Sequence, residues 1–269
     1  MLTSVTPVVF LVRLLATAGI VLAVTAIVGR LGPRVGGVVA GLPIVVGPGL
    51  AFIALDETPE YLVEAAGFVL VSLTATQAFM FAYGRAARGF GPATAVFVAF
   101  ASWVGVIAIL AVPRLSPIAA ALLFTCAAVV SARLLRQVQA VPAPPPAPGG
   151  WVSLLLRAGL AGLMVGAISL GSQALGPKLA GLLLAYPVGM TVIAVTIHQR
   201  YGKEAAGATL AAAALGTLSI GAFAFAVAVL TPTLGAASAL AAALAASLLV
   251  SLLLLAFRHG RTSAEGASR

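Results

Sequence analysis

Two arginines stand inside apolar runs of this sequence, Arg13 and Arg157, and 144 residues separate them. A guanidinium binds a carboxylate or phosphate through two parallel hydrogen bonds, so the two side chains could attract an anion. A structural role is the other interpretation, because an arginine at the centre of a membrane costs about 2.5 to 3.5 kcal/mol. Arg13 would then pair with Glu64 and Arg157 with Glu204. The two interpretations are compatible if the ion pairs open or a glutamate takes up a proton.

Two prolines, Pro43 and Pro187, are also 144 residues apart, and each lies ten residues after the proline that opens its predicted helix. Ten residues rise about 15 Å, which is half of a hydrocarbon core about 30 Å thick. Proline lacks an N–H and clashes with the carbonyl four residues earlier. We therefore expect the carbonyls of Val39 and Leu183 to be partly free near the midplane, where they could contact a ligand. The alternative is a kink that neighbouring helices satisfy.

Other polar groups in the apolar runs are sparse. Serine and threonine in membrane helices usually bond to backbone or to a neighbouring helix, so Ser72, Thr74 and Thr76 are expected to be structural. Gln77, which aligns with Thr217, is the remaining candidate ligand. The candidate substrate-binding set is completed by two residues beside the prolines, Gly47 and Tyr186.

These residues recur because the sequence contains an internal repeat, with one copy in each half of the chain. Leu31-Gly32-Pro33-Arg34 returns as Leu175-Gly176-Pro177-Lys178, at the same offset of 144. Further along, Glu64-Ala65-Ala66-Gly67 returns as Glu204-Ala205-Ala206-Gly207, at an offset of 140. One loop is therefore four residues shorter in the second copy.

The composition indicates a polytopic membrane protein. The chain is 62% hydrophobic and 8% charged, whereas soluble domains are about 45 to 50% apolar with roughly a quarter of residues charged. Its net charge of +9 comes from basic residues scattered at the ends of apolar runs, and no aromatic-interleaved basic patch indicates nucleic-acid binding. Cys126 is the only cysteine, which leaves no disulfide framework or cysteine metal cluster.

Spanning helices need about 20 apolar residues, and nine are predicted: Pro7 to Gly29, Pro33 to Leu55, Tyr61 to Tyr83, Pro92 to Val112, Pro117 to Leu135, Trp151 to Gly171, Pro177 to Ile197, Lys203 to Leu230 and Thr233 to Phe257. The predicted organisation is a first repeat over 1–112, a connecting helix over 113–136, a proline-rich linker over 137–150, a second repeat over 151–257 and a polar tail over 258–269. The fold class is all-α.

Basic residues in short loops favour the cytoplasmic side of a membrane. With the N-terminus outside, that side receives five pairs: Arg30 and Arg34, Arg85 and Arg88, Arg133 and Arg136, Arg200 and Lys203, and Arg258 and Arg261. The acidic loop at 56–60 then lies outside. The fifth helix has no counterpart in the other copy, so the chain crosses the membrane an odd number of times between the start of the first copy and the start of the second. The two copies therefore begin on opposite sides of the membrane. The repeats are predicted to be inverted, in a four plus one plus four arrangement.

Each half also resembles the GlpM-like family of small bacterial membrane proteins, through Ala40-Gly41-Leu42-Pro43 and Ala185-Tyr186-Pro187. That family implies no substrate. The layout is similar to the fused fluoride exporters, in which an extra helix joins two inverted four-helix halves. The asparagine and phenylalanine-box signatures of those exporters are missing, so only the architecture is carried over.

These patterns predict a secondary transporter of a small solute in the cell (inner or plasma) membrane, with the N-terminus outside and the C-terminus cytoplasmic. The arginines favour an anionic or amphipathic metabolite, and inverted repeats are common in such carriers. The alternative is a non-transporting scaffold that organises partners through its helices. No zinc motif, nucleophile elbow or Walker sequence indicates an enzyme, a metal or a nucleotide cofactor.

Overall fold

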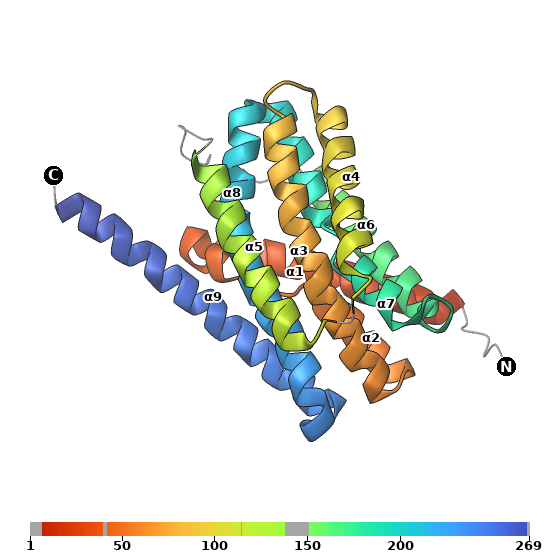
Figure 1. The fold of residues 1–269 in the computed structure, drawn as a ribbon. Helices are drawn as coiled ribbons and strands as arrows, with labels where there is room; N and C mark the ends of the chain where they lie inside the picture. Colours follow the sequence, from red (N-terminus) through yellow and green to blue (C-terminus); the bar gives the residue numbers. More distant parts are fainter. Residues whose placement is uncertain (1–6, 40–41, 114, 138–150, 268–269) are drawn as a thin grey trace.

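A computed structural model describes residues 7–39, 42–113, 115–137 and 151–267, with backbone alone for 27–39, 136–137 and 257–267. These residues form helices and no strand, which confirms the predicted all-α class (Figure 1). The helices are α1 (Pro7–Val39), α2 (Val46–Asp56), α3 (Pro59–Ala86), α4 (Pro92–Leu110), α5 (Pro117–Gln137), α6 (Trp151–Leu170), α7 (Ser172–Leu184), α8 (Val188–Leu234) and α9 (Ala236–Ala267).

Seven helical stretches among the described residues are long and apolar enough to cross a membrane. The chain therefore has the helices of a multi-pass membrane protein. One of the seven, Ser172–Leu234, combines α7 and α8 across a short non-helical segment, and its 63 residues are about three times as many as one crossing requires.

Proline and hydroxyl residues begin two helices at or close to a predicted start, α5 at Pro117 as predicted and α3 two residues before the predicted Tyr61. Pro59 follows the N-cap Thr58, whose side chain accepts a hydrogen bond from the Tyr61 N–H. Pro117 follows Ser116, whose Oγ accepts from the Ala119 N–H at 3.2 Å. Proline suits this position because the first N–H groups of a helix have no intrahelical partner.

The first half differs from the prediction between residues 29 and 46. The loop predicted at 30–32 is absent, and the helical backbone of α1 continues to Val39. The predicted helix from Pro33 to Leu55 is therefore divided: its start belongs to α1, 42–45 are non-helical, and its end forms α2. A proline in the first turn of a helix and a proline inside a longer helix look alike in sequence, which is why the pattern predicts a helix start at Pro33.

In the second half, glycines with positive φ mark bends of the chain. Gly176 (φ 70°) precedes Pro177, and Gly202 (φ 87°) precedes Lys203, at two of the predicted helix starts. Gly235 (φ 75°) separates α8 from α9. A residue with a side chain rarely adopts this conformation, so glycine is required at these bends.

The helix α3 is the centre of the bundle, with 72% of its apolar window buried. It packs on α4, α5, α7 and α8, while α8 packs on α9 and α1 packs on α6 (Figure 1). Glycines allow close approach at these contacts: a Cβ at Gly181 would overlap the Ala65 carbonyl, and one at Gly162 would lie 2.5 Å from the Leu14 carbonyl. Small residues serve the same purpose in membrane bundles generally.

The predicted tail differs from the structure, and the predicted linker is almost wholly outside the described residues. The tail predicted over 258–269 is helical up to Ala267, as part of α9. The linker predicted over 137–150 lies outside the described residues from 138 onwards.

Candidate functional site

The second helix of each predicted half is interrupted at its inner proline. In the second half, α7 ends at Leu184 and α8 begins at Val188, which leaves a non-helical segment of Ala185, Tyr186 and Pro187. Pro187 has no N–H, and its carbonyl accepts from the Thr191 N–H at 2.9 Å as α8 starts. The sequence predicts a kink at this point, whereas the structure has a complete break of the helix.

Two hydroxyl groups of α3 bond to the backbone at this break. Ser72 donates to the Leu182 carbonyl at 2.7 Å, and Thr76 donates to the Ala185 carbonyl at 3.0 Å. The Leu183 carbonyl, expected to be partly free, instead accepts from the Tyr186 N–H at 3.1 Å. The predicted structural role of Ser72 and Thr76 is confirmed, and their spacing of four residues, which puts both on one helix face, is the signal in the sequence.

The break in the first half spans Leu42 to Val45, before α2 begins. Pro43 is buried, and its carbonyl accepts from the Gly47 N–H at 2.7 Å. Ile44 and Val45 pack against a cluster of Val21, Ala158 and Ala161 from α1 and α6. Val39 is the last described residue of α1, and only its backbone is described.

The two interrupted helices meet close to their breaks. A Cβ added at Gly49, in the first turn of α2, would overlap the side chain of Leu184, the last residue of α7. A Cβ at Gly47 would lie 3.6 Å from the Pro43 ring and 3.9 Å from Phe223 of α8. The start of α2 is therefore enclosed by the end of α7 and by α8.

Tyr186 projects from the second break into an aromatic cluster. Its ring lies edge-on to Trp103 with centroids 5.1 Å apart, to Phe100 at 6.0 Å and to Phe79 at 6.2 Å. Such T-shaped contacts are a favourable geometry for aromatic rings. They fix the half-buried Tyr186 between α3 and α4 beside the break.

Gln77 is fully enclosed where α3 meets α8, with 2% of its surface exposed. Its Nε2 donates to Thr217 Oγ1 at 2.7 Å, the residue with which Gln77 aligns in the predicted repeat. Ser131 of α5 donates to the Gln77 backbone carbonyl at 3.4 Å. The side-chain oxygen of Gln77 has no hydrogen-bond partner among the described residues, and a buried polar atom of this kind calls for a ligand, an ion or a water.

Arg13 is buried and forms an ion pair with Asp56, whereas the sequence predicts Glu64 as its partner. Its two terminal nitrogens donate to the two carboxylate oxygens at 2.5 and 2.8 Å, the bidentate geometry that suits a guanidinium. The ring of Phe52 lies 5.4 Å from Cζ, within cation–π range. Glu64 is exposed on α3.

Arg157 has different surroundings from Arg13. It is half-buried, and its Nε donates to the Ser153 carbonyl one turn earlier at 3.4 Å. It makes no ion pair with a carboxylate in the part of the chain that the structure describes. Its predicted partner, Glu204, is exposed and lies beside a surface hollow at the bend between the two parts of α8.

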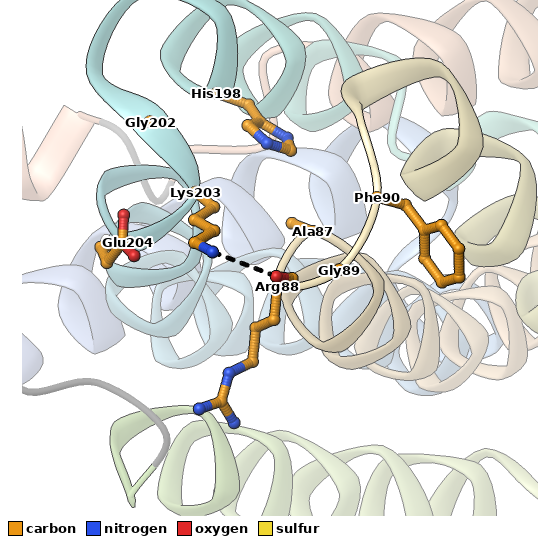
Figure 2. A pocket seen from close by; sticks show the side chains of 8 residues that line it. All are labelled: Ala87, Arg88, Gly89, Phe90, His198, Gly202, Lys203 and Glu204. Atoms are coloured by element: carbon orange, nitrogen blue, oxygen red, sulfur yellow. Dashed lines mark hydrogen bonds between the residues drawn. The ribbon is translucent and has the colours of Figure 1, made fainter.

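That hollow has a volume of about 470 Å³ and lies between the α3–α4 loop and α8 (Figure 2). It is lined by Ala87, Arg88, Gly89, Phe90, His198, Gly202, Lys203 and Glu204. Lys203 Nζ donates to the Arg88 carbonyl at 3.2 Å, and Figure 2 shows the Arg88 guanidinium pointing away from that contact. His198 Nδ1 lies 3.3 Å from the Tyr83 hydroxyl.

A comparable group of contacts joins the opposite end of α3 to the α6–α7 connection. The Tyr61 hydroxyl donates to the Ser172 carbonyl at 2.6 Å, and the Ser172 hydroxyl donates to Glu57. Each end of α3 is thus tied to the second half, by Ser172 at one end and by Lys203 at the other.

Comparisons of this chain with protein-family models, curated proteins and solved structures give no match. The functional interpretation therefore depends on the residues and contacts described above.

Proposed function

We propose that this protein is a secondary transporter of a small solute, working by alternating access between two inverted repeats. In this proposal the chain crosses the membrane nine times, in a four plus one plus four arrangement with the N-terminus outside. The solute binds where the breaks at Pro43 and Pro187 approach one another.

The interruption of two equivalent helices is the observation that carries this proposal. Non-helical backbone at membrane depth is tolerated only where protein or a water-filled cavity satisfies it. Paired broken helices at the interface of two repeats are the usual site of solute binding in carriers. Here the two inner prolines are 144 residues apart, and both lie in non-helical segments.

The packing of the helices supports the repeat. A two-fold relation brings the helices nearest the axis into contact with their own equivalents, and α1 packs on α6 as α3 packs on α8. The pairing of α3 with α4 corresponds to that of α8 with α9. The connecting helix α5 contacts both α3 and α8, and the Gln77–Thr217 bond joins equivalent residues of the two halves.

The electrostatic character favours an anionic or amphipathic solute. The net charge is +9, and the half-buried Arg157 lacks a carboxylate among the described residues. A guanidinium in that setting binds carboxylate or phosphate groups well.

Cysteine accessibility tests the proposal without knowledge of the solute. In a Cys126→Ser background, single cysteines replace Ile44 and Val188, the half-buried neighbours of the two prolines. A membrane-impermeant maleimide is applied to right-side-out and to inverted membrane vesicles. A carrier exposes the break to each side in turn, so both positions should react in both preparations.

A disulfide between cysteines at 57 and 172 provides the control, because Glu57 and Ser172 are in contact. It should hold that end of the molecule closed and abolish labelling from its side alone. If neither break reacts from either side, the protein has no moving access route, and the scaffold interpretation replaces transport.

A further inference from the structure

The arginine-bearing helix of each half makes a side-chain contact at the same spacing along the chain. Arg13 of α1 meets Asp56 of α2, 43 residues further along the chain. In the second half, the Ser153 hydroxyl of α6 lies 3.4 Å from the Thr196 hydroxyl of α8, again 43 residues further along. The same spacing relates Arg157 to Arg200. Position 200 thus corresponds to Asp56 by the repeat offset, and it lies one helical turn after Thr196 on the same face of α8.

The two halves differ in charge at this point. Asp56 provides an internal counter-ion for the buried Arg13, whereas its equivalent, Arg200, is a second cation and is exposed. Arg157 is half-buried and has only the Ser153 carbonyl as a hydrogen-bond acceptor among the described residues. A cation withdrawn from water is stable only when it is paired, so the second half lacks the anion that the first half contains.

The side chains around this position suit an oxygen anion. An arginine in a helix points back toward the N-terminus of that helix, so the guanidinium of Arg157 reaches toward Ser153 and Thr196. Two guanidinium groups and two hydroxyls can together donate several hydrogen bonds to one phosphate or carboxylate.

We propose that Arg157 and Arg200, with the hydroxyls of Ser153 and Thr196, bind a phosphate or carboxylate group between α6 and the first part of α8. The bound anion takes the place that the Asp56 carboxylate occupies in the first half. The anion comes from an acidic phospholipid headgroup or from a free solute. The site shares Arg157 with the evidence for an anionic solute in the proposed function, but it does not require transport, because a lipid bound there would serve structure alone.

Purified full-length protein in dodecyl maltoside, stripped of lipid, distinguishes the two sources. In one arm, inorganic phosphate is titrated against sodium chloride at matched ionic strength. In the other, phosphatidylglycerol is added in mixed micelles and compared with phosphatidylcholine. The thermal unfolding midpoint gives an apparent affinity in each arm. A rise with phosphate indicates a free anion, and a rise with phosphatidylglycerol alone indicates a lipid.

Charge-neutral variants locate the site. Arg157→Gln and Arg200→Gln should each weaken the anion affinity about ten- to a hundredfold, as expected when one charge-assisted hydrogen-bonding partner is lost. Arg133→Gln is the matched control, because Arg133 is an exposed arginine on α5, a helix that among the described residues packs on α3 and α8 and not on α6. It should respond to the anion as the wild type does.

The exchange Arg200→Asp is the most discriminating variant, because it gives the second half the counter-ion of the first. It should raise the unfolding midpoint in the absence of added anion and abolish the further rise on adding anion. Since residue 200 is exposed, this variant remains informative if Arg157→Gln does not fold. The proposal is overturned if the wild type responds to neither anion, or if Arg200→Asp responds as the wild type does.

Discussion

Arg13 brings a positive charge into an apolar helix pair, and Asp56 offsets it there with two hydrogen bonds. Asp56→Asn should destabilise the protein by about 1 to 3 kcal/mol, because charged hydrogen bonds contribute roughly this much and the carboxylate side chain is still 35% exposed. Removal of one member of a fully buried pair costs more, about 3 to 5 kcal/mol. Unfolding in mixed micelles with increasing denaturing detergent measures the difference.

Glu64→Gln is the matched control, since it removes a nearby exposed carboxylate that makes no ion pair within the described residues. It should change stability by less than about 0.5 kcal/mol, as surface substitutions usually do. Equal losses for Asp56→Asn and Glu64→Gln would mean that Arg13 does not depend on Asp56.

The need of Arg13 for a carboxylate is predictable from the sequence, but the identity of that carboxylate is not. Asp56, Glu57, Glu60 and Glu64 lie close together in the chain, and each could reach the same end of α1. The choice depends on how α2 ends against α1, and that depends on the break at Pro43. A local pattern contains no information about such a contact between separate helices.

The break between α7 and α8 is stabilised by α3 as well as by Pro187. Ser72→Ala and Thr76→Val should each cost about 1 kcal/mol, because each leaves a carbonyl at the α7–α8 break without its donor. This is the usual magnitude of hydrogen bonds between membrane helices. Amides 184–191 should also exchange hydrogen faster in both variants, and mass spectrometry of peptides from the break measures that exchange.

Thr74→Val serves as the control for these two variants, because Thr74 bonds to the Leu70 carbonyl of its own helix. It should leave exchange at 184–191 unchanged. Faster exchange there in Thr74→Val as well would assign the effect to a general loosening of α3 rather than to the two lost bonds.

At the scale of helices, the sequence predicts the starts well and the interruptions only in part. Prolines place the first residues of α4 and α5 correctly at Pro92 and Pro117, because proline is favoured in the first turn. The same rule predicts a new helix at Pro33, where α1 instead continues. The sequence pattern does not predict the complete break at Pro187, because the break depends on hydroxyl donors from Ser72 and Thr76 on another helix.

The molecule as a whole is arranged around α3, whose 28 residues extend about 42 Å, more than the thickness of a hydrocarbon core of about 30 Å. Contacts at its two ends involve different parts of the second half. Tyr61 meets Ser172 near the start of α3, and the Arg88 carbonyl meets Lys203 just beyond its end. These two ends should therefore face opposite sides of the membrane.

Single cysteines in a Cys126→Ser background test this arrangement at Glu60, Gly89 and Ala143. Glu60 and Gly89 are exposed, and a Cβ at Gly89 meets no atom within 4 Å. An impermeant maleimide should label Glu60→Cys on intact cells, but Gly89→Cys and Ala143→Cys only after permeabilisation, because the basic loops face the cytoplasm. Labelling of all three in permeabilised cells verifies that each thiol can react. Labelling of both Glu60→Cys and Ala143→Cys on intact cells would mean that an even number of crossings separates these two positions. The two halves would then not be inverted.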